Sequence, residues 1–353
     1  MPFPKVLFIA HNFYPLKGGA EYAIKTLLEE LSSCCQCFVV AGGENKKLQI
    51  GKITCFLVKT IRQIEECVER IKPQLVLTHG PLAPFATTIA KNMGLPVILY
   101  VVDHCYFCPT PILMSSCDKN CNACSSYKKN KDMFHKMREM FSRVDKVVYD
   151  SKFIRKIGVE FYGIDGPVIY PFIRLKDSIV KRNPAKARYI SMLKLMAHKG
   201  AQIFIEIAKK MPDKQFLAAG RKGAEIHIDS VTNLKYIGDV SPKRFFSETH
   251  ILLVPSVWPD PGPRIVVEGL ANKIPVLGSN VGGIPEVLAG GGILINDYQN
   301  PYAWIKKIRM LLENKRVYRE IAAKGFAHTK WYNFSKEVDS MKKIIQSVMG
   351  KPL

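Results

Sequence analysis

Short apolar runs rich in β-branched residues recur along the whole chain, and stretches with helical spacing separate them. We expect strands at residues 6–10, 37–41, 55–58, 75–78, 97–102 and 146–151, and again at 189–193, 216–220, 251–256, 275–279 and 292–295. Continuous apolar strands that alternate with helices are typical of parallel sheets covered on both faces. The pattern therefore predicts an α/β fold.

The series of strands is interrupted once, at residues 172–186. This segment is charged, contains a proline and lacks sustained periodicity, so it is expected to be a linker. A length of 353 residues suits two domains, and an apolar content of 47% suffices for their cores and excludes general disorder. We expect domains at 1–172 and 173–329, followed by a last helical segment at 330–353. Two doubly wound domains would bind ligands at the carboxyl ends of their strands.

The sequence predicts a cytoplasmic protein. No segment reaches the roughly 18 apolar residues of a membrane-spanning helix. The first apolar run, Val6 to Ala10, is too short for a signal-peptide core. The cysteines are accordingly expected to stay reduced.

The formal net charge of +22 is the unusual feature of the composition. Such an excess predicts attraction to an anionic partner, which could be a nucleic acid, an acidic membrane surface or a phosphorylated small molecule. A solvated, lysine-rich surface is the alternative.

Two acidic residues accompany a turn between a strand and a helix in the second half of the chain. The strand ends at Ser256, a loop rich in proline and glycine follows, and a helix begins near Pro263. Asp260 lies in the loop and Glu268 in the helix. Free N–H groups at a helix N-terminus suit an anion or sugar hydroxyls, and Glu268 could accept two hydrogen bonds from a diol such as a ribose. Solvated surface charge would also explain two acids at this spacing.

A second loop of this kind follows the first strand. It ends in Gly18-Gly19, and an amphipathic helix comes directly after it. Two glycines let a backbone approach a phosphate or sugar closely, although a tight turn explains them as well. The chain has neither GxGxxG after a strand nor GxxxxGK[ST]. It therefore lacks the sequence motifs of dinucleotide oxidoreductases and of P-loop enzymes.

Residues 255–286 resemble the nucleotide-sugar signature of family 4 retaining glycosyltransferases of the GT-B fold. The resemblance lies in the acid–seven–acid pair Asp260 and Glu268, in ANKIPVLGS and in GGIPE. It extends to the glycine loop of Gly18-Gly19-Ala20-Glu21. It implies two doubly wound Rossmann-like domains that face each other across a cleft, with the segment 330–353 returning to the first domain.

The resemblance also implies a donor site. It assigns Glu268 to the ribose, Asp260 to the donor sugar and Gly18-Gly19 to the phosphates. The basic pair on the pyrophosphate would be Lys194 and Lys199, although lone lysines are more often surface residues. The remaining residues on the donor sugar would be those of the loop and first helical turn, namely Gly262, Pro263 and Arg264.

The implied reaction is transfer of a hexosyl group from a nucleotide diphosphate sugar, with retention of configuration. The acceptor would be a polysaccharide, a lipid-linked carbohydrate or a small molecule, as in cell-envelope or polysaccharide biosynthesis. Lysines and helix N-termini would stabilise the leaving group, so no cofactor or catalytic metal is expected.

Asp103 and His104 follow the expected strand 97–102. The family has His-Asp here, and alignment through Cys108-Pro109 retains Asp103 but places Val102 where the histidine belongs. Either Asp103 alone contacts the reacting sugar, or the loop shifts to present His104. A structural histidine is the third alternative.

Four positions depart from the family pattern. Asp260 replaces a glutamate, residues 261–264 read PGPR rather than a PFG type, Lys194 replaces an arginine and the histidine is displaced. A shorter acid could change the sugar that fits, and a lysine cannot form the bidentate fork of an arginine on a phosphate. An inactive member or one of altered specificity is the alternative.

Five of the ten cysteines lie in the expected loop 104–126. Two CxxC pairs, 105–108 and 121–124, have a spacing typical of zinc ligands. The family resemblance favours a structural zinc or a redox knot formed by four of them, with Cys105 as a possible further ligand. These four are Cys108, Cys117, Cys121 and Cys124. Disulfides or free thiols are the alternatives, and a catalytic zinc is not expected.

Residues 128–146 form a basic amphipathic pattern. Such a helix could lie on an anionic membrane, which would make the protein peripheral at the inner face. An ordinary helix with its apolar face in the core is the alternative, and a basic rim could touch lipid even then.

Two other functional classes are alternatives. A sugar-nucleotide epimerase or phosphorylase of the same fold is one. A basic nucleic-acid-binding protein with a cysteine knuckle is the other, but it would need basic runs interleaved with aromatic residues, which are not present. No nucleic acid partner is therefore expected.

Overall fold

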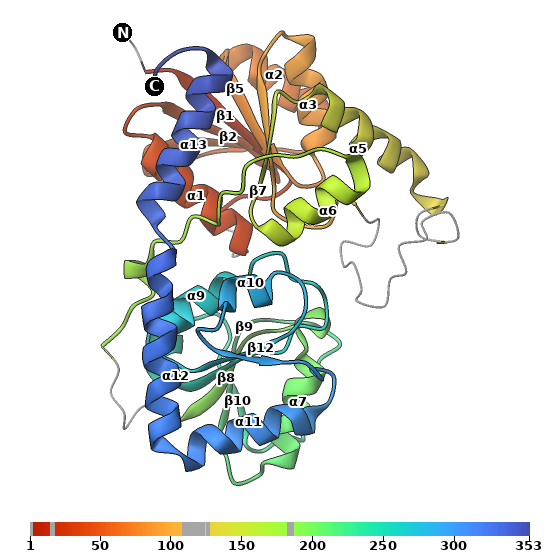
Figure 1. Ribbon diagram of the computed structural model, residues 1–353. Coiled ribbons are helices and arrows are strands. Elements are labelled where there is room, and N and C mark those ends of the chain that lie inside the picture. The colour runs from red at the N-terminus through yellow and green to blue at the C-terminus, as the bar shows by residue number, and fades with distance from the viewer. Residues whose placement is uncertain (1–2, 15–17, 108–123, 125–127, 182–186) are drawn as a thin grey trace. The chain divides into compact units, whose positions relative to one another are not determined.

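A computed structural model describes residues 3–14, 18–107, 124, 128–181 and 187–353 (Figure 1). The described chain divides into two compact units. Unit 1 contains the residues up to Ile173 together with Asn333–Leu353, and unit 2 is formed by Arg174–Tyr332.

Unit 1 is built on a seven-stranded sheet with the order β3-β4-β2-β1-β5-β6-β7. The strands are β1 (Lys5–Ala10), β2 (Gln36–Gly42), β3 (Lys46–Ile50), β4 (Ile53–Val58), β5 (Leu75–His79), β6 (Val97–Val101) and β7 (Lys146–Tyr149). All neighbours are parallel except β3 and β4, which form an antiparallel pair at one edge.

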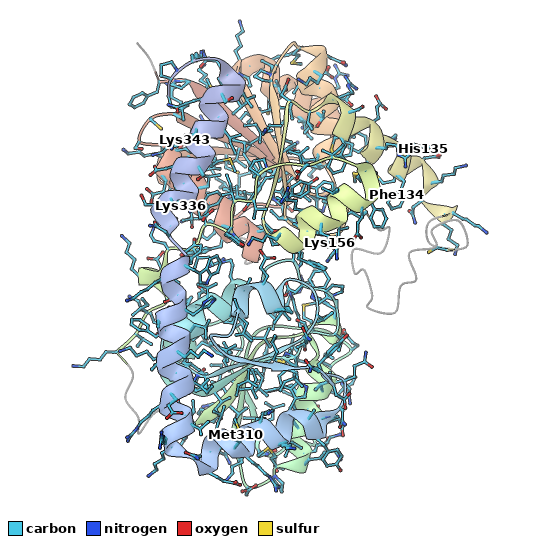
Figure 2. All side chains as sticks on the ribbon, in the orientation of Figure 1. Phe134, His135, Lys156, Met310, Lys336 and Lys343 are labelled. Atoms are coloured by element: carbon cyan, nitrogen blue, oxygen red, sulfur yellow. The ribbon has the colours of Figure 1, made fainter. Side chains whose placement is uncertain are left out.

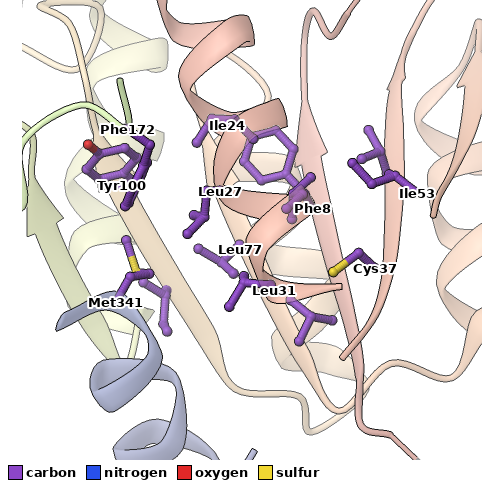
Figure 3. Packing of buried hydrophobic residues seen from close by; sticks show 14 of the residues in the cluster. Phe8, Ile24, Leu27, Leu31, Cys37, Ile53, Leu77, Tyr100, Phe172 and Met341 are labelled. Atoms are coloured by element: carbon purple, nitrogen blue, oxygen red, sulfur yellow. The ribbon is translucent and has the colours of Figure 1, made fainter. Parts of the chain in front are cut away.

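Helices cover both faces of this sheet. They are α1 (Gly19–Leu31), α2 (Ile61–Ile71), α3 (Ala83–Asn92), α5 (Lys131–Arg143), α6 (Lys152–Tyr162) and α13 (Phe334–Met349). Alternate residues of β1 point to opposite faces: Phe8 packs with α1 and α13, whereas Ile9 packs with α2 and α3. Figure 3 shows the first of these cores, where Leu27 of α1 and Met341 of α13 lie beside the strands.

The last helix is an integral part of unit 1. Val338, Met341 and Ile345 of α13 are buried in the core that contains Phe8. Glu337, also buried, accepts a hydrogen bond from the backbone N–H of Tyr170 at 2.9 Å. Burial raises the pKa of the Glu337 carboxyl group, and this hydrogen bond partly opposes the rise.

Unit 2 is built on a six-stranded parallel sheet with the order β10-β9-β8-β11-β12-β13. Its strands are β8 (Tyr189–Leu195), β9 (Phe216–Lys222), β10 (Leu234–Tyr236), β11 (Thr249–Val254), β12 (Val276–Ser279) and β13 (Ile293–Ile295). Its helices are η1 (Leu175–Asp177), η2 (Ala197–Lys199), α7 (Ala201–Lys210), α8 (Pro242–Glu248), α9 (Arg264–Ala271), α10 (Ile284–Leu288), α11 (Pro301–Glu313), α12 (Lys315–His328) and η3 (Thr329–Trp331).

The two faces of the second sheet are also covered. Ile251 faces a core shared with α7 and α11, where Trp304 is fully buried. On the other face α9 packs so closely that a Cβ on Gly269 would lie 2.6 Å from Leu252 and 3.0 Å from Val276. The expected α/β fold with parallel, Rossmann-like sheets is therefore confirmed. In the described part of the chain, every helix is too short or too polar to cross a membrane.

Candidate functional sites

Lys194 lies at an irregularity near the carboxyl end of β8. The register with β9 shifts between Leu193 and Leu195, and Lys194 has a φ of 66°, in the left-handed region. A non-glycine residue there costs about 1–3 kcal/mol, and such strain is concentrated at functional sites. The bulge turns the chain, because the N–H of Met196 donates to the carbonyl oxygen of Lys194 at 3.0 Å.

Lys199 reaches the loop that follows β11. Its Nζ pairs with a carboxylate oxygen of Asp260, and it also lies 4.7 Å from the ring centroid of Trp258. The Asp260 residue is 6% exposed and the Lys199 side chain 22%. Two residues that the sequence analysis assigned to the donor are thus direct neighbours.

The loop 255–263 is held from two sides. On one side the carbonyl oxygen of His198 accepts from the N–H groups of Val257 at 3.1 Å and Trp258 at 3.3 Å. On the other side the N–H of Gly283 donates to the carbonyl oxygen of Asp260 at 2.7 Å. A Cβ on Gly283 would overlap the carbonyl oxygen of Pro261. The second glycine of the GGIPE motif is therefore needed for close contact with this loop.

The same loop leads into α9, which carries Glu268. The helix begins at Arg264, after the half-buried Gly262 and the buried Pro263, and among the described residues no side chain caps its N-terminus. Its first-turn N–H groups carry the positive end of the helix dipole. Glu268 is 8% exposed, and burial raises the pKa of its carboxyl group, while Arg264 at 3.4 Å lowers it.

His198 belongs to this site but was not predicted. Its ring lies edge-on to Trp258 at 5.2 Å. Burial and the nearby Lys199 lower the pKa of His198 to about 4, and Lys194 adds to this effect while Asp260 opposes it. His198 is therefore a neutral ring between two cations at neutral pH. The only signal in the sequence was its place beside Lys199.

In unit 1, Asp103 and His104 follow β6 but have different surroundings. Asp103 is half-buried, and its Oδ1 accepts from the N–H of Cys105 at 2.8 Å. His104 is fully buried, with its ring 5.8 Å from that of Phe153 in an edge-on arrangement. In this structure Asp103 is the one of the two with exposed surface at the sheet edge.

A second unpredicted histidine ends the neighbouring strand β5. His79 is 6% exposed and stacks on Phe8 at 5.2 Å. Within the described part of the chain, neither ring nitrogen has a hydrogen-bond partner. Burial lowers the pKa of His79, while Asp103 and Glu21 act in the opposite direction. A histidine at the carboxyl end of an expected strand was the available signal.

The glycine loop of unit 1 is described only in part. Gly18 precedes α1 with a φ of −98°, so its conformation is open to any residue. A Cβ at this position would meet the carboxylate of Glu21, which lies at the end of a flexible side chain and can move away. Gly19 is the first residue of α1 and is exposed.

The proposed zinc ligands Cys108, Cys117 and Cys121 lie outside the described residues. Cys124 and Cys105 are described, and both are half-buried. Burial and the neighbouring Asp103 raise the pKa of the Cys105 thiol. Within the described ranges no group of three His, Cys, Asp or Glu side chains is placed to hold a metal ion.

The basic helix α5 has its apolar face in the core of unit 1. Phe134, Met137, Met140 and Phe141 are buried, and the ring of Phe141 lies 4.7 Å from that of Tyr162. His135, next to Phe134, is exposed (Figure 2). The basic rim of this helix, which includes Lys131 and Arg138, remains at the surface, and so does Met133.

Comparison with known families gives a match for unit 2. Residues 174–328 match the model of the family described as glycosyl transferases group 1. The Spore coat protein SA of Bacillus subtilis is 31% identical over 88 residues. That match covers 24% of this chain and 23% of the spore coat protein, well under two thirds of its length.

Solved structures resemble the chain over nearly its full length. Sucrose-phosphate synthase from Thermosynechococcus elongatus has a TM-score of 0.77 at 11% identity, covering 98% of this chain and 99% of that one. HepE from Anabaena in complex with UDP-glucose has a TM-score of 0.78 at 13% identity, covering 97% and 99%. At these identities the likeness is one of fold. Residues 174–328 are therefore similar to the group 1 glycosyl transferases, and the chain has the GT-B fold of these solved structures.

Proposed function

We propose that the protein transfers a hexosyl group from a nucleotide diphosphate sugar to an acceptor, with retention of configuration. The observation that carries the proposal is the site at the carboxyl edge of the unit 2 sheet. There a strained lysine, a lysine–aspartate pair and a buried glutamate on one helix lie within the region that matches the family. HepE, a structure of the same fold, was solved with UDP-glucose.

In this proposal each side chain has a separate role on the donor. Glu268 accepts hydrogen bonds from the ribose, and Asp260 with residues 261–264 contacts the sugar. Lys194 and Lys199 bind the pyrophosphate, and the phosphates are also the role assigned to Gly18-Gly19. The charge of the departing diphosphate would be stabilised by the two lysines and the N-terminus of α9, in place of a catalytic metal ion.

The acceptor side of the proposal rests on unit 1. Asp103 is the polar group at the carboxyl end of β6, where ligands of such sheets bind. A carbohydrate or lipid-linked acceptor in cell-envelope or polysaccharide synthesis fits the relatives, which include a spore coat protein and a glycosyltransferase of lipopolysaccharide biosynthesis. A structural zinc on Cys108, Cys117, Cys121 and Cys124 remains part of the proposal.

The donor site can be tested by thermal unfolding with a panel of nucleoside diphosphates and sugar nucleotides. A ligand present at about 100 times its Kd adds about 2.7 kcal/mol, which corresponds to a rise of about 5–10 °C for units of this size. We expect such a rise for at least one member of the panel. Glu268→Ala should abolish it, because the ribose loses its acceptor.

The matched control is Glu320→Ala. Glu320 also pairs with an arginine four residues away on its own helix, but this pair on α12 is exposed. This control should keep the full shift. The proposal is wrong if no nucleotide stabilises the wild-type protein.

We further propose that unit 1 touches anionic membranes through the exposed rim of α5. Most of the apolar face of α5 is buried, so attraction would be mainly electrostatic, at about 1 kcal/mol per basic residue. Lys131→Glu/Arg138→Glu should therefore weaken flotation with anionic liposomes at least about tenfold. Lys306→Glu/Arg309→Glu on α11 makes the same change in charge and should have little effect. Equal flotation of the wild type with neutral and anionic liposomes would refute this contact.

A further inference from the structure

Arg264 and Glu268 form an ion pair across one turn of α9. Nη2 of Arg264 lies 3.4 Å from Oε1 of Glu268, and the two side chains are 15% and 11% exposed. Exposed pairs of this spacing contribute little, because water screens both charges. This pair is largely withdrawn from water, so the field of the guanidinium acts strongly on the carboxylate.

The charges around Glu268 make its ionisation depend on Arg264. Burial disfavours the carboxylate, and Asp177 of η1 adds to this effect. Asp177 has a basic neighbour of its own, Arg174, at 4.0 Å. Arg264 is the group that acts in the other direction, both by its charge and by its hydrogen bond.

The backbone at Glu268 is fixed independently of this pair. The side-chain amide of Asn272 donates to the carbonyl oxygens of Glu268 at 2.8 Å and Ser178 at 3.2 Å. Its oxygen accepts from the N–H of Val180 at 2.9 Å. A change of Arg264 should therefore alter the side chain of Glu268 and leave the course of α9 in place.

The state of the carboxyl group decides what it can bind. An ionised carboxylate offers two acceptor oxygens and can receive both hydroxyls of a vicinal diol, whereas a protonated carboxyl group has one oxygen committed as a donor. Hydrogen bonds to a charged partner are also the stronger ones. Recognition of a ribose by Glu268 thus requires the ionised form.

We propose that Arg264 is a positioning residue, which keeps the Glu268 carboxylate charged and oriented for the 2′,3′-diol of a ribonucleotide. This inference rests on the proposed function, because it presumes that a nucleotide occupies the site. This role is separate from the contact with the donor sugar proposed above, because the nucleoside diphosphates of the test carry no sugar beyond the ribose. The ligand class is a ribonucleoside diphosphate, in preference to its 2′-deoxy counterpart.

The test compares the affinities for a ribonucleoside diphosphate and the matching 2′-deoxynucleotide, measured by calorimetry. The wild-type protein should prefer the ribonucleotide, and Arg264→Gln should lower that preference about tenfold or more. Without the guanidinium, Glu268 takes up a proton more readily. The ratio of ribonucleotide to 2′-deoxynucleotide affinity of Arg264→Gln should then increase as the pH rises, and the wild type should show the same increase at lower pH.

Three further variants separate the possible results. Arg264→Lys restores a cation and should recover much of the preference and the wild-type pH profile. Arg264→Gln/Glu268→Gln should show no pH dependence and lose no more preference than Glu268→Gln alone, because the two residues act through one contact. Arg316→Gln removes the arginine of the exposed pair with Glu320 on α12 and should change nothing.

The results distinguish this inference from the proposed function. If the wild type binds no nucleotide, the proposed function itself fails. If Arg264→Gln weakens both nucleotides equally with an unchanged pH profile, Arg264 contacts the donor directly and the positioning role is wrong. The positioning role is also wrong if Arg264→Gln melts like the wild type and keeps its preference for the ribonucleotide.

Discussion

Gly200→Ala is expected to unfold or severely destabilise unit 2. Gly200 lies between η2 and α7 with a φ of 83°, and a Cβ there would overlap the carbonyl oxygen of Pro255. The left-handed conformation costs about 1–3 kcal/mol for a residue with a side chain. The overlap adds about 1–3 kcal/mol, because it is with backbone that cannot rotate away. Chemical denaturation should show the loss as a lower midpoint.

The control for this prediction is Gly238→Ala in the same unit. Gly238 also has a positive φ, 62°, but no atom lies within 4 Å of the position that a Cβ would occupy. Gly238→Ala should therefore lose only the stability that the left-handed conformation costs. Equal losses in the two variants would contradict the steric argument, and with it the close packing of the loop after β11 on the turn before α7.

Gly200→Ala should also weaken the binding of nucleotide. The carbonyl oxygen of Pro255 belongs to the segment that continues into Trp258 and Asp260, so a displaced Pro255 shifts the partner of Lys199. Any Gly200→Ala protein that remains folded should bind nucleotide more weakly than Gly238→Ala. The glycine that follows Lys199 thus connects the stability of the unit with the geometry of its site.

The strands of both sheets could be predicted wherever burial is complete on both faces. Runs such as 6–10 and 251–256 overlap the strands β1 and β11, which are almost entirely buried. Two edge strands could not be predicted. β3 is KKLQI and β10 is only LKY, and each is partly exposed, so their sequences lack the apolar run that signals a covered strand.

The residues of the candidate site could be named from the sequence, but the contacts between them could not. The motif resemblance pointed to Lys199, Asp260, Arg264 and Glu268 by position. The pairing of Lys199 with Asp260 depends on the turn at Gly200 and on the loop held by Gly283, which no local pattern specifies. His198 and His79 were missed because a single histidine has no periodic or spacing signal, and its surroundings appear only after folding.

Lys199→Met is expected to destabilise unit 2 by about 3 kcal/mol, since removing one partner of a buried ion pair leaves the other charge uncompensated. Asp260→Asn should cost less. Asp260 is 6% exposed and has little contact with water, whereas the lysine side chain is 22% exposed and can extend its ammonium group toward solvent. The measurement is the free energy of unfolding of both single variants.

The double variant Lys199→Met/Asp260→Asn completes a double-mutant cycle. It should be more stable than the sum of the single losses predicts, with a coupling of about 1–3 kcal/mol, because no buried charge is left without its partner. Additive losses would show that the pair does not contribute to folding. Nucleoside diphosphates should stabilise the wild type and fail to stabilise the double variant, even where its fold is recovered. If the double variant binds diphosphate as tightly as the wild type, the proposed role of Lys199 on the pyrophosphate is wrong. The positive charge that stabilises the leaving group would then come from other residues.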